Sequence, residues 1–523
     1  MDNDKKRLKY PVGIQSFEKL RRGGYVYVDK THLIHELVTT GQCYFLSRPR
    51  RFGKSLLLST IQAYFEGKKE LFEGLTIMDL EEEWGVYPVI RLDFSAYDPF
   101  QNGHIEKILD TQLSRYEEIY GITTPDTSMD QRFNRLIYDI FQKTGKEVVV
   151  LIDEYDAPIT AHITDPSLFD TRRNILRALY SNLKSMDEYL KFVMLTGVTR
   201  YSKTSVFSGL NNMEDISLDD SYATICGITE AEMKEFLQSG IDELALKETL
   251  SYEELMEKLK FNYDGYHFTA ECTDIYNPFS ILQSLKKGRL GMYWYQSGKA
   301  TLIVDLINRT PHLLSKELNR SVAERMLTEI DTATTSPTAL MFQAGYLTIK
   351  KWDPITKVYT LGLPNQEVKE GLYTDLAASS LDIAPSILST NIWEVKTLLM
   401  NGKPEIAFDR LKSFLGGISY LVTQNKPEIF YENNLYLIFS LIGIDTTTEL
   451  HTSEGRIDMV LKFPEYIYVM ELKLDGTAQD ALTQIDSHNY TLPFKYDGRK
   501  IIKVGINFSS KKRNITDIVL SIP

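Results

Sequence analysis

The residues Gly53, Lys54 and Ser55 could bind a phosphate chain. They stand between a short apolar run, residues 43–46, and a leucine-rich stretch with helical spacing. A strand, a polar turn and a helix in this order point the backbone N–H groups of the turn and of the first helical turn at phosphate. Lys54 would bring positive charge to the terminal phosphates, and the Ser55 hydroxyl would bind Mg²⁺. The segment therefore predicts a site for ATP or a related nucleotide.

One position of this phosphate-binding pattern is irregular. Arg48 stands where the full pattern has a glycine, and Pro49 removes one N–H group from the loop. A left-handed conformation at Arg48 would cost about 1–2 kcal/mol. The loop could therefore open differently or bind phosphate less tightly, and a scaffold loop with an ordinary surface lysine is the alternative. We expect the following Arg50, Arg51 and Phe52 to contact the nucleotide.

A second apolar run ends in two acids, Asp153 and Glu154. Residues 148–152 are continuously aliphatic, as in a parallel strand that is buried on both faces. Ligands bind at the carboxyl ends of such strands. We expect Asp153 to hold Mg²⁺ opposite Ser55, and Glu154 to polarise the water that attacks the γ-phosphate. The alternative is that the acids, with Asp156, cap a helix.

Thr196 ends a further apolar run, residues 191–196, and Arg200 follows it. They are candidate sensors of the γ-phosphate, with an ordinary loop as the alternative. Strands alternate with helical patterns from residue 43 to residue 196, which predicts a mostly parallel sheet with right-handed crossovers. Ahead of these elements, residues 25–30 predict a short strand.

A second group of charged residues lies in the last hundred residues, where we expect strands at 446–450, 456–461 and 466–473. Glu471 and Lys473 are two residues apart, so they share one face of their strand. Asp458 on the neighbouring strand, Glu471 and the carbonyl of Leu472 could bind Mg²⁺, or Mn²⁺, through oxygen. Lys473 would orient the metal-bound water or stabilise charge on a scissile phosphate.

Two helices flank these strands. Glu432, on the helix expected from residue 430 to 443, could complete the metal site, and Gln484 lies on the helix expected at 478–485. The alternative is an edge strand whose charges face water. A set of basic residues further along could contact nucleic-acid phosphates or form a solvated face; its members are Lys495, Arg499, Lys500, Lys503, Lys511, Lys512 and Arg513.

The chain resembles two known families. The segments Arg-Pro-Arg-Arg-Phe-Gly-Lys-Ser, Leu-Ile-Asp-Glu-Tyr-Asp-Ala-Pro-Ile and Leu-Thr-Gly-Val-Thr-Arg are similar to those of the AAA-ATPase-like family, in which an arginine-rich loop is usual. This resemblance implies an ATP-binding P-loop domain with a small helical lid. The motifs Gly-Arg-Ile-Asp and Glu-Leu-Lys resemble the PD-(D/E)XK nuclease superfamily, in which a later glutamine, here Gln484, is frequent. Domains of that superfamily can lose cleavage and keep binding.

We therefore predict an α/β protein with three parts. Residues 1–290 form a P-loop NTPase domain with a parallel sheet and a lid, 291–395 a helical, winged-helix-like connector with a two-strand ribbon, and 396–523 an α/β nuclease-like domain. The net charge of −12 argues against a generally nucleic-acid-binding surface but permits a local basic groove. Three scattered cysteines favour the cytoplasm. The longest apolar run, 435–444, is too short to span a bilayer, so we expect no membrane contact.

The function that we expect is ATP binding and hydrolysis coupled to Mg²⁺-dependent cleavage of nucleic acid, with DNA favoured over RNA. The alternative is an NTP-dependent signalling or scaffolding protein whose nuclease-like domain binds without cutting. A homo-oligomer stays open because many ATPases of the AAA type assemble.

Overall fold

The computed structural model divides the chain into two compact units. The N-terminal unit comprises Met1–Ser297 and Arg320–Glu367, and the C-terminal unit comprises Gly298–Asn319 and Val368–Pro523. The residues that the structure describes are 8–101, 103–124, 127–201, 206, 212–298, 300–309, 318, 320–328, 330, 337–418, 428–443, 445–452, 455–512 and 514–522. The expected connector, 291–395, contributes to both units, and the three domain boundaries stay a prediction.

A five-stranded parallel sheet forms the centre of the N-terminal unit, in the order β2-β3-β4-β1-β5. Every residue of β3 is buried, as its aliphatic run predicts. The parallel sheet expected from the sequence is thereby confirmed, and the two-residue β5 is an addition to it. The strands are β1 (Cys43–Ser47), β2 (Val89–Asp93), β3 (Val148–Asp153), β4 (Leu190–Gly197) and β5 (Glu214–Asp215).

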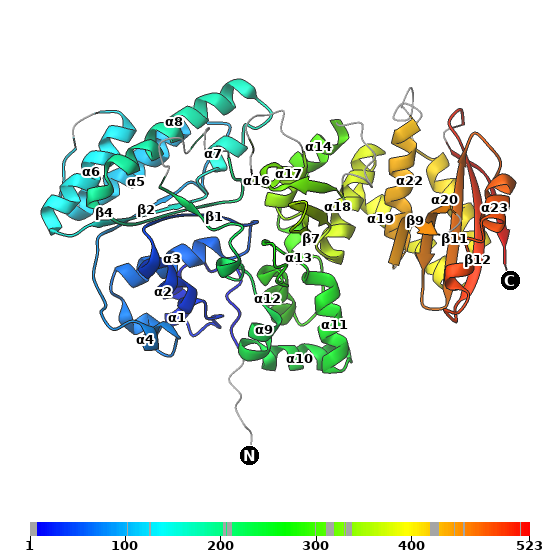
Figure 1. The fold of residues 1–523 in the computed structure, drawn as a ribbon, viewed down its shortest axis with the longest axis horizontal. Helices are drawn as coiled ribbons and strands as arrows, with labels where there is room; N and C mark the ends of the chain where they lie inside the picture. The colour runs from blue at the N-terminus through cyan, green and yellow to red at the C-terminus, as the bar shows by residue number, and fades with distance from the viewer. Residues whose placement is uncertain are drawn as a thin grey trace, which may run out of the picture. The chain divides into compact units, whose positions relative to one another are not determined.

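Helices cover both faces of this sheet (Figure 1). One face carries α1 (Phe17–Arg22), α2 (Thr31–Thr40), α3 (Lys54–Phe65) and α4 (Ile77–Leu80). The other carries α5 (His104–Tyr120), α6 (Met129–Thr144) and α8 (Pro166–Ser185), with α7 (Ala157–Thr160) beside them. The sheet is thus the middle of three layers, and the carboxyl end of β1 leads directly into the loop before α3.

The strand expected at residues 25–30 is absent, so that prediction is wrong. Val26 N donates to Lys9 O at 2.9 Å, but residues 25–30 form no strand ladder with the described residues. Tyr27 instead packs edge to face on Phe17, with ring centroids 5.1 Å apart. The Asp29 carboxylate accepts a hydrogen bond from Thr31 N at 2.8 Å and so begins α2. Alternating apolar residues here serve packing between helices.

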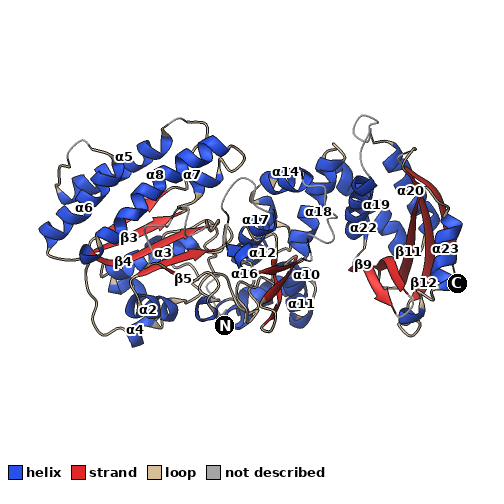
Figure 2. Ribbon diagram, turned by 45° about the horizontal axis from the view of Figure 1, so that its top comes forward, coloured by secondary structure: helices blue, strands red, loops and turns tan. Residues whose placement is uncertain are grey.

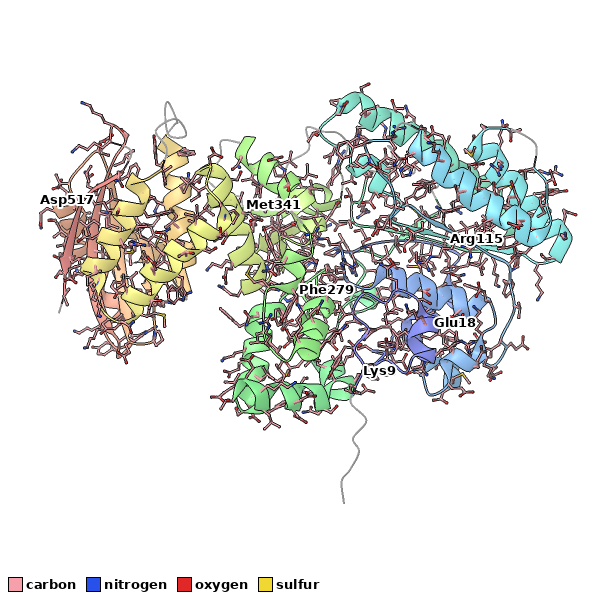
Figure 3. All side chains as sticks on the ribbon, turned by 180° about the vertical axis from the view of Figure 1, so that it is seen from behind. Lys9, Glu18, Arg115, Phe279, Met341 and Asp517 are labelled. Carbon is pink, nitrogen blue, oxygen red and sulfur yellow. The ribbon has the colours of Figure 1, made fainter. Side chains whose placement is uncertain are left out.

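The helices that follow the sheet bury a core of their own, which includes Met233, Ile241, Leu255 and Leu259. At the start of α12, the Asn277 side chain accepts hydrogen bonds from the backbone N–H groups of residues 279 and 280 and so caps the helix. These lid helices are α9 (Glu230–Phe236), α10 (Gln238–Glu248), α11 (Tyr252–Tyr263), α12 (Pro278–Lys287) and α13 (Tyr293–Gln296). Figure 3 shows Phe279 of α12 among the other side chains of this unit.

The predicted two-strand ribbon has a third strand. The antiparallel order is β6-β8-β7, with β6 (Ser321–Ala323), β7 (Thr348–Asp353) and β8 (Val358–Gly362). Helices α16 (Glu324–Thr328) and α17 (Pro337–Gln343) lie between β6 and β7 in the chain. A strand, two helices and a two-stranded wing agree with the winged-helix-like expectation.

A mixed five-stranded sheet forms the C-terminal unit, in the order β13-β12-β11-β10-β9, with only β11 and β12 parallel. Its strands are β9 (Asp445–Thr452), β10 (Gly455–Lys462), β11 (Tyr466–Leu474), β12 (Lys500–Ser509) and β13 (Asn514–Ser521). The last two strands were not expected from the sequence. They occupy the segment that we treated as a basic surface.

Helices pack on both faces of this sheet (Figure 2). Helix α23 (Ala478–Ser487) covers β11 and β12, and α20 (Pro404–Gly416) and α22 (Glu428–Ile442) lie on the opposite face. The unit also contains α14 (Thr301–Arg309), α18 (Gln366–Ser380), whose first two residues belong to the N-terminal unit, and α19 (Pro385–Met400). Among the helices of the described residues, none has the length and apolar composition that a membrane crossing needs.

Candidate functional site

The loop between β1 and α3 turns at Arg51 and Gly53. Both residues are left-handed, with φ of 67° and 102°. Gly53 adopts this conformation without strain, and a Cβ atom there would meet nothing within 4 Å. Arg48 is not among the left-handed residues. The strain that we considered for Arg48 therefore falls at Arg51, whose side chain is exposed.

Arg48 anchors the loop to the segment that follows β5. Its side chain is 1% exposed. Nη1 donates to Ser217 O at 2.7 Å, and Nη2 donates to Tyr222 O at 3.2 Å. The guanidinium also lies over the Phe268 ring, 4.4 Å from its centroid. Burial lowers the Arg48 pKa to about 10. The arginine in place of glycine thus ties the loop to the segment that follows β5, and its buried Nε has no hydrogen-bond partner among the described residues.

Aromatic residues of the lid also contact this loop. Phe52 is buried and meets Tyr266 and Phe268 edge to face, with centroids 4.9 and 5.4 Å away. Trp294 Nε1 donates to the Arg50 carbonyl at 2.9 Å, and the Arg50 guanidinium lies 5.6 Å from the Trp294 ring. Tyr266, Phe268 and Trp294 therefore position the loop, a role that the sequence analysis did not predict.

Lys54 is 5% exposed and faces its own loop. Its Nζ donates to the carbonyls of Arg48, at 2.9 Å, and Pro49, at 3.1 Å. Asp153 is 1% exposed and accepts from Thr196 Oγ1 at 2.9 Å. The predicted sensor Thr196 therefore directs its hydroxyl to the predicted metal ligand.

A residue that the sequence analysis missed, Arg91 of β2, also meets Asp153. Its Nη2 lies 3.0 Å from Asp153 Oδ2 and 3.4 Å from Ser55 O. The available signal was a lone arginine within the apolar run 89–92, at a strand position where a charge needs a partner. Only the pairing of β2 with β3 shows which partner it has.

Glu154 follows β3 in a left-handed conformation, with φ of 50°. Burial raises its pKa, and the nearby carboxylates of Asp156, Asp153 and Asp93 raise it further, while Lys54 opposes them.

Arg200, the second predicted sensor, is engaged elsewhere. Its Nε lies 2.5 Å from Asp215 Oδ2, and its backbone N donates to a glutamine side chain of α17.

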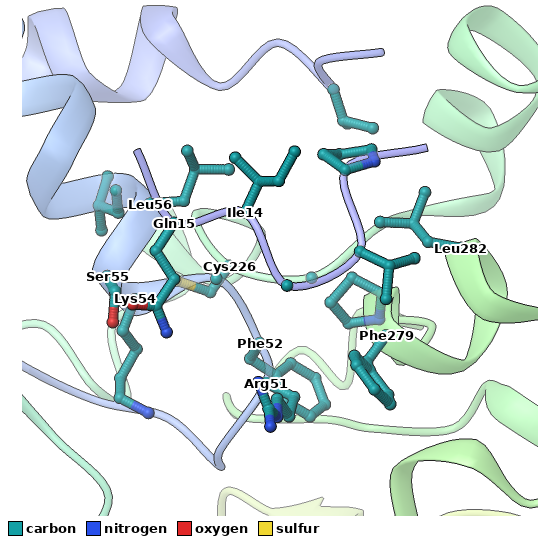
Figure 4. A pocket seen from close by; sticks show the side chains of 18 of the residues that line it. Ile14, Gln15, Arg51, Phe52, Lys54, Ser55, Leu56, Cys226, Phe279 and Leu282 are labelled. Atoms are coloured by element: carbon teal, nitrogen blue, oxygen red, sulfur yellow. The ribbon is translucent and has the colours of Figure 1, made fainter. Parts of the chain in front are cut away.

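A cavity of about 430 Å³ opens over the loop. Figure 4 shows Lys54 and Ser55 on one side of it and Phe279 and Leu282 on the other. The N-terminal segment 11–15 closes it, with Ile14 among the apolar lining residues. One end is therefore polar and the other apolar. Of the predicted nucleotide contacts, Asp153, Thr196 and Arg200 are not among the lining residues, whereas Arg50, Arg51, Phe52, Gly53, Lys54, Ser55 and Glu154 are.

The C-terminal unit brings a second charged group together at neighbouring strands. Met459 of β10 faces Met470 of β11, so the adjacent Asp458 and Glu471 come side by side. Asp458 Oδ2 accepts from the Leu472 backbone N at 2.9 Å. Lys473 lies on the same face as Glu471, as alternation predicts, with Nζ 3.4 Å from Glu471 Oε1.

Gln484 of α23 completes this group. Lys473 Nζ donates to Gln484 Oε1, and Gln484 Nε2 donates to Tyr490 OH at 3.4 Å. The helix therefore holds the lysine beside the carboxylates, and Tyr490 holds the glutamine.

Glu471 has a buried carboxylate oxygen that could bind a further partner. It is 2% exposed, and its Oε2 has no hydrogen-bond partner among the described residues. Burial raises the Glu471 pKa to about 7, and the Asp458 carboxylate adds to the rise. Burial likewise raises the Asp458 pKa. An unpaired buried oxygen beside a second carboxylate fits a divalent cation, which takes oxygen ligands.

The described residues bring two carboxylates together here, those of Asp458 and Glu471. Among the described residues, no group of three or more histidine, cysteine or acidic side chains could hold a metal. Glu432 lies on α22, but its side chain is outside the described set. Two members of the predicted basic set pair with acids: Arg499 Nη2 with Asp497 at 2.7 Å, and Lys503 with Asp486 at 2.5 Å. Arg513 lies outside the described residues.

Comparison with known proteins agrees with both sites. A predicted AAA-ATPase family model matches residues 11–207, and a PD-(D/E)XK nuclease superfamily model matches residues 426–518. A protein of Azotobacter chroococcum mcd 1, named only as an uncharacterised protein in the vnfD 5′ region, is 34% identical over 523 residues, which is 98% of this chain and 99% of that protein. The first match contains the loop and the acids after β3, and the second contains Asp458, Glu471 and Lys473. The chain belongs to the AAA-ATPase-like family and carries a PD-(D/E)XK nuclease superfamily domain in its C-terminal unit.

Proposed function

We propose that the N-terminal unit binds and hydrolyses ATP in the cavity over the loop. The phosphates would lie at the N-terminus of α3, where backbone N–H groups and the helix dipole attract anions. Lys54 would leave the carbonyls of its own loop for the terminal phosphates. The apolar end, near Phe279 and Leu282, suits the base.

In this proposal, Ser55 and Asp153 would hold Mg²⁺, which would supply positive charge beside the phosphates. Glu154 holds the attacking water and accepts its proton. Thr196 fixes the orientation of the Asp153 carboxylate through its hydroxyl. Arg200 as a γ-phosphate sensor would first have to leave Asp215.

We further propose that the C-terminal unit cleaves phosphodiester bonds of nucleic acid, with DNA as the favoured substrate. Asp458 and Glu471 would hold Mg²⁺ or Mn²⁺, which supplies Lewis-acid activation of water and phosphate. Lys473 would orient the attacking water, and Gln484 would position Lys473. The observation that supports this most is the buried, unpartnered Oε2 of Glu471 beside a second carboxylate. With all three cysteines free, the reducing cytoplasm is the compartment that we propose.

The test is cleavage of single-stranded, duplex and plasmid DNA by the full chain in Mg²⁺ or Mn²⁺, with and without ATP. Lys473→Ala removes the catalytic lysine, and Lys403→Ala is the matched control, an exposed lysine of the same unit outside the basic set. Cutting that is lost in the first variant and kept in the second supports the proposal. Binding without cutting would favour a scaffolding role for the nuclease-like domain.

Coupling between the two sites is tested in the same assay. Lys54→Ala should abolish any dependence of cutting on ATP. Unchanged cutting and binding in that variant, with ATP present, would contradict coupling and leave two independent activities.

A further inference from the structure

We infer that Arg91 is a built-in counter-cation that occupies the metal-binding oxygen of Asp153 until Mg²⁺ arrives with nucleotide. This inference rests on the proposed nucleotide site, and it assigns to Arg91 the control of when that site takes its metal.

The need for a counter-cation follows from the burial of Asp153. The carboxylate is 1% exposed, and an unpaired buried carboxylate is strongly unfavourable. Thr196 supplies a neutral hydroxyl to Oδ1 at 2.9 Å. Lys54 Nζ is held by the two loop carbonyls. Among the described residues, Arg91 is the cation that forms an ion pair with Asp153, at 3.0 Å.

The position of Arg91 is fixed by its backbone. Tyr116 OH accepts from Arg91 N at 2.7 Å and donates to Arg91 O at 3.2 Å. Strand β2 pairs in parallel with β3, with Arg91 opposite Leu151 and Asp93 opposite Asp153. The side chain therefore reaches along the sheet edge to the end of β3, and its guanidinium contacts Asp153 and the carbonyl of Ser55.

These two contacts place the guanidinium beside both residues that would hold Mg²⁺. A metal cation and the Arg91 guanidinium would therefore compete for the same oxygen, Asp153 Oδ2. Metal alone has to displace Arg91 and leave its charge without a partner. Metal bound to a nucleotide brings phosphate charge that receives the displaced guanidinium. The arrangement therefore favours Mg²⁺ together with nucleotide over Mg²⁺ alone.

The test measures how much Mn²⁺ the nucleotide-free full chain binds. Electron paramagnetic resonance gives the concentration of the free ion, and the bound amount is the difference from the total. All proteins carry Asp458→Ala and Glu471→Ala, so that the C-terminal site is removed. Arg91→Met should gain one Mn²⁺ per chain, with a dissociation constant at least about tenfold lower than in the parent, because the competing charge is gone. Adding Asp153→Asn to Arg91→Met should abolish that gain.

Thermal unfolding provides a second measurement. Without metal, Arg91→Met should unfold at a lower temperature than the parent, and Mn²⁺ alone should restore most of the loss. Arg132→Met is the matched control, because Arg132 pairs with Glu117 and Asp110 away from the loop. Its loss of stability should not respond to Mn²⁺.

Equal Mn²⁺ binding by the parent and Arg91→Met would overturn the inference, and so would a gain that survives Asp153→Asn. Binding of a fluorescent ATP analogue with Mg²⁺ is measured separately on the wild type. A wild type that binds no nucleotide would overturn the proposed ATPase, whereas the Mn²⁺ comparison alone decides on Arg91.

Discussion

Replacing Glu367 by glutamine should remove a pH-dependent loss of stability from the N-terminal unit. Glu367 is 3% exposed. Its Oε1 accepts from the backbone N of Trp294 at 2.7 Å and of Tyr295 at 3.2 Å, and its Oε2 accepts from Ser280 Oγ at 2.7 Å. Burial outweighs these donors and raises the Glu367 pKa to about 7. The folded protein therefore favours the protonated carboxyl.

The magnitude follows from the difference between the ordinary pKa of 4.5 and the folded value of about 7. That difference corresponds to about 3 kcal/mol in the free energy of unfolding. Because the folded pKa is the higher one, this stability is fully present below the ordinary pKa and is lost as the pH rises through about 7. Glutamine keeps an acceptor oxygen and has no such dependence. The variant should therefore gain up to about 3 kcal/mol relative to wild type over this range.

Denaturant unfolding of the full chain, followed by tryptophan fluorescence at steps from about pH 5 to about pH 8, measures this difference. Two tyrosines near Glu367 do not interfere: burial raises the pKa of Tyr263 to about 12 and that of Tyr266 well above its ordinary value. Glu118→Gln is the control, an exposed glutamate of α5 in the same unit. A constant difference between wild type and Glu367→Gln at every pH would refute the reasoning.

Three further predictions concern the loop and the C-terminal sheet. Lys54→Ala should weaken nucleotide binding at least about a hundredfold, measured by titration with a fluorescent ATP analogue, because the charge that meets the phosphates is lost. Trp294→Phe should cost about 1 kcal/mol of stability and raise the KM for ATP, because the Nε1 bond to Arg50 O is removed. Gly505→Ala should destabilise the C-terminal unit by about 2 kcal/mol or more in denaturant unfolding, since its Cβ would lie 2.1 Å from a backbone carbonyl of α23. Gly416→Ala, whose Cβ would meet only a flexible side-chain amide at 3.0 Å, is the control that should be tolerated.

The parts of the fold that the sequence predicts correctly depend on local signals. The continuous aliphatic run 148–152 is buried on both faces, as in a central parallel strand. Gly53 and Lys54 stand next to each other at the start of α3, and a two-residue alternation places Glu471 and Lys473 on one face. Each of these inferences needs only residues within one element and its neighbour.

The strands β12 and β13 were missed because their signal is mixed. Lysines and an asparagine interrupt the apolar residues of 500–509, and the segment also reads as a basic surface. In the structure, β12 lies inside the sheet beside β11. Its Asn507 is buried and accepts from Gly476 N at 2.9 Å, and its Lys503 pairs with Asp486 of α23. Gly505 in its middle lets α23 approach closely. None of these facts can be derived without knowing which strand pairs with which.

The roles of Arg48 and Arg91 were missed for a different reason. Arg48 is buried and Arg91 is half-buried, and the partner of each lies far along the chain: Ser217 for Arg48, and Asp153 for Arg91. The sequence shows that a buried charge needs compensation, yet it does not show by what. Around this loop, Arg48, Arg91 and Lys54 all bond the protein's own oxygens, and the proposed function moves only Lys54 to phosphate.

The chain connects the two units at three places. The chain passes between them after Ser297, after Asn319 and after Glu367, and the last passage lies inside the continuous helix α18. In the N-terminal unit, Glu367 is bonded to the backbone of Trp294, whose ring nitrogen bonds the nucleotide-binding loop.

In the C-terminal unit, the same helix is joined to α22 by Tyr373 and Tyr436, whose hydroxyls are 2.8 Å apart. Helix α22 in turn packs on β10, the strand that carries Asp458. Helix α18 therefore has hydrogen-bonded partners in each unit: Trp294 and Ser280 through Glu367, and α22 through Tyr373.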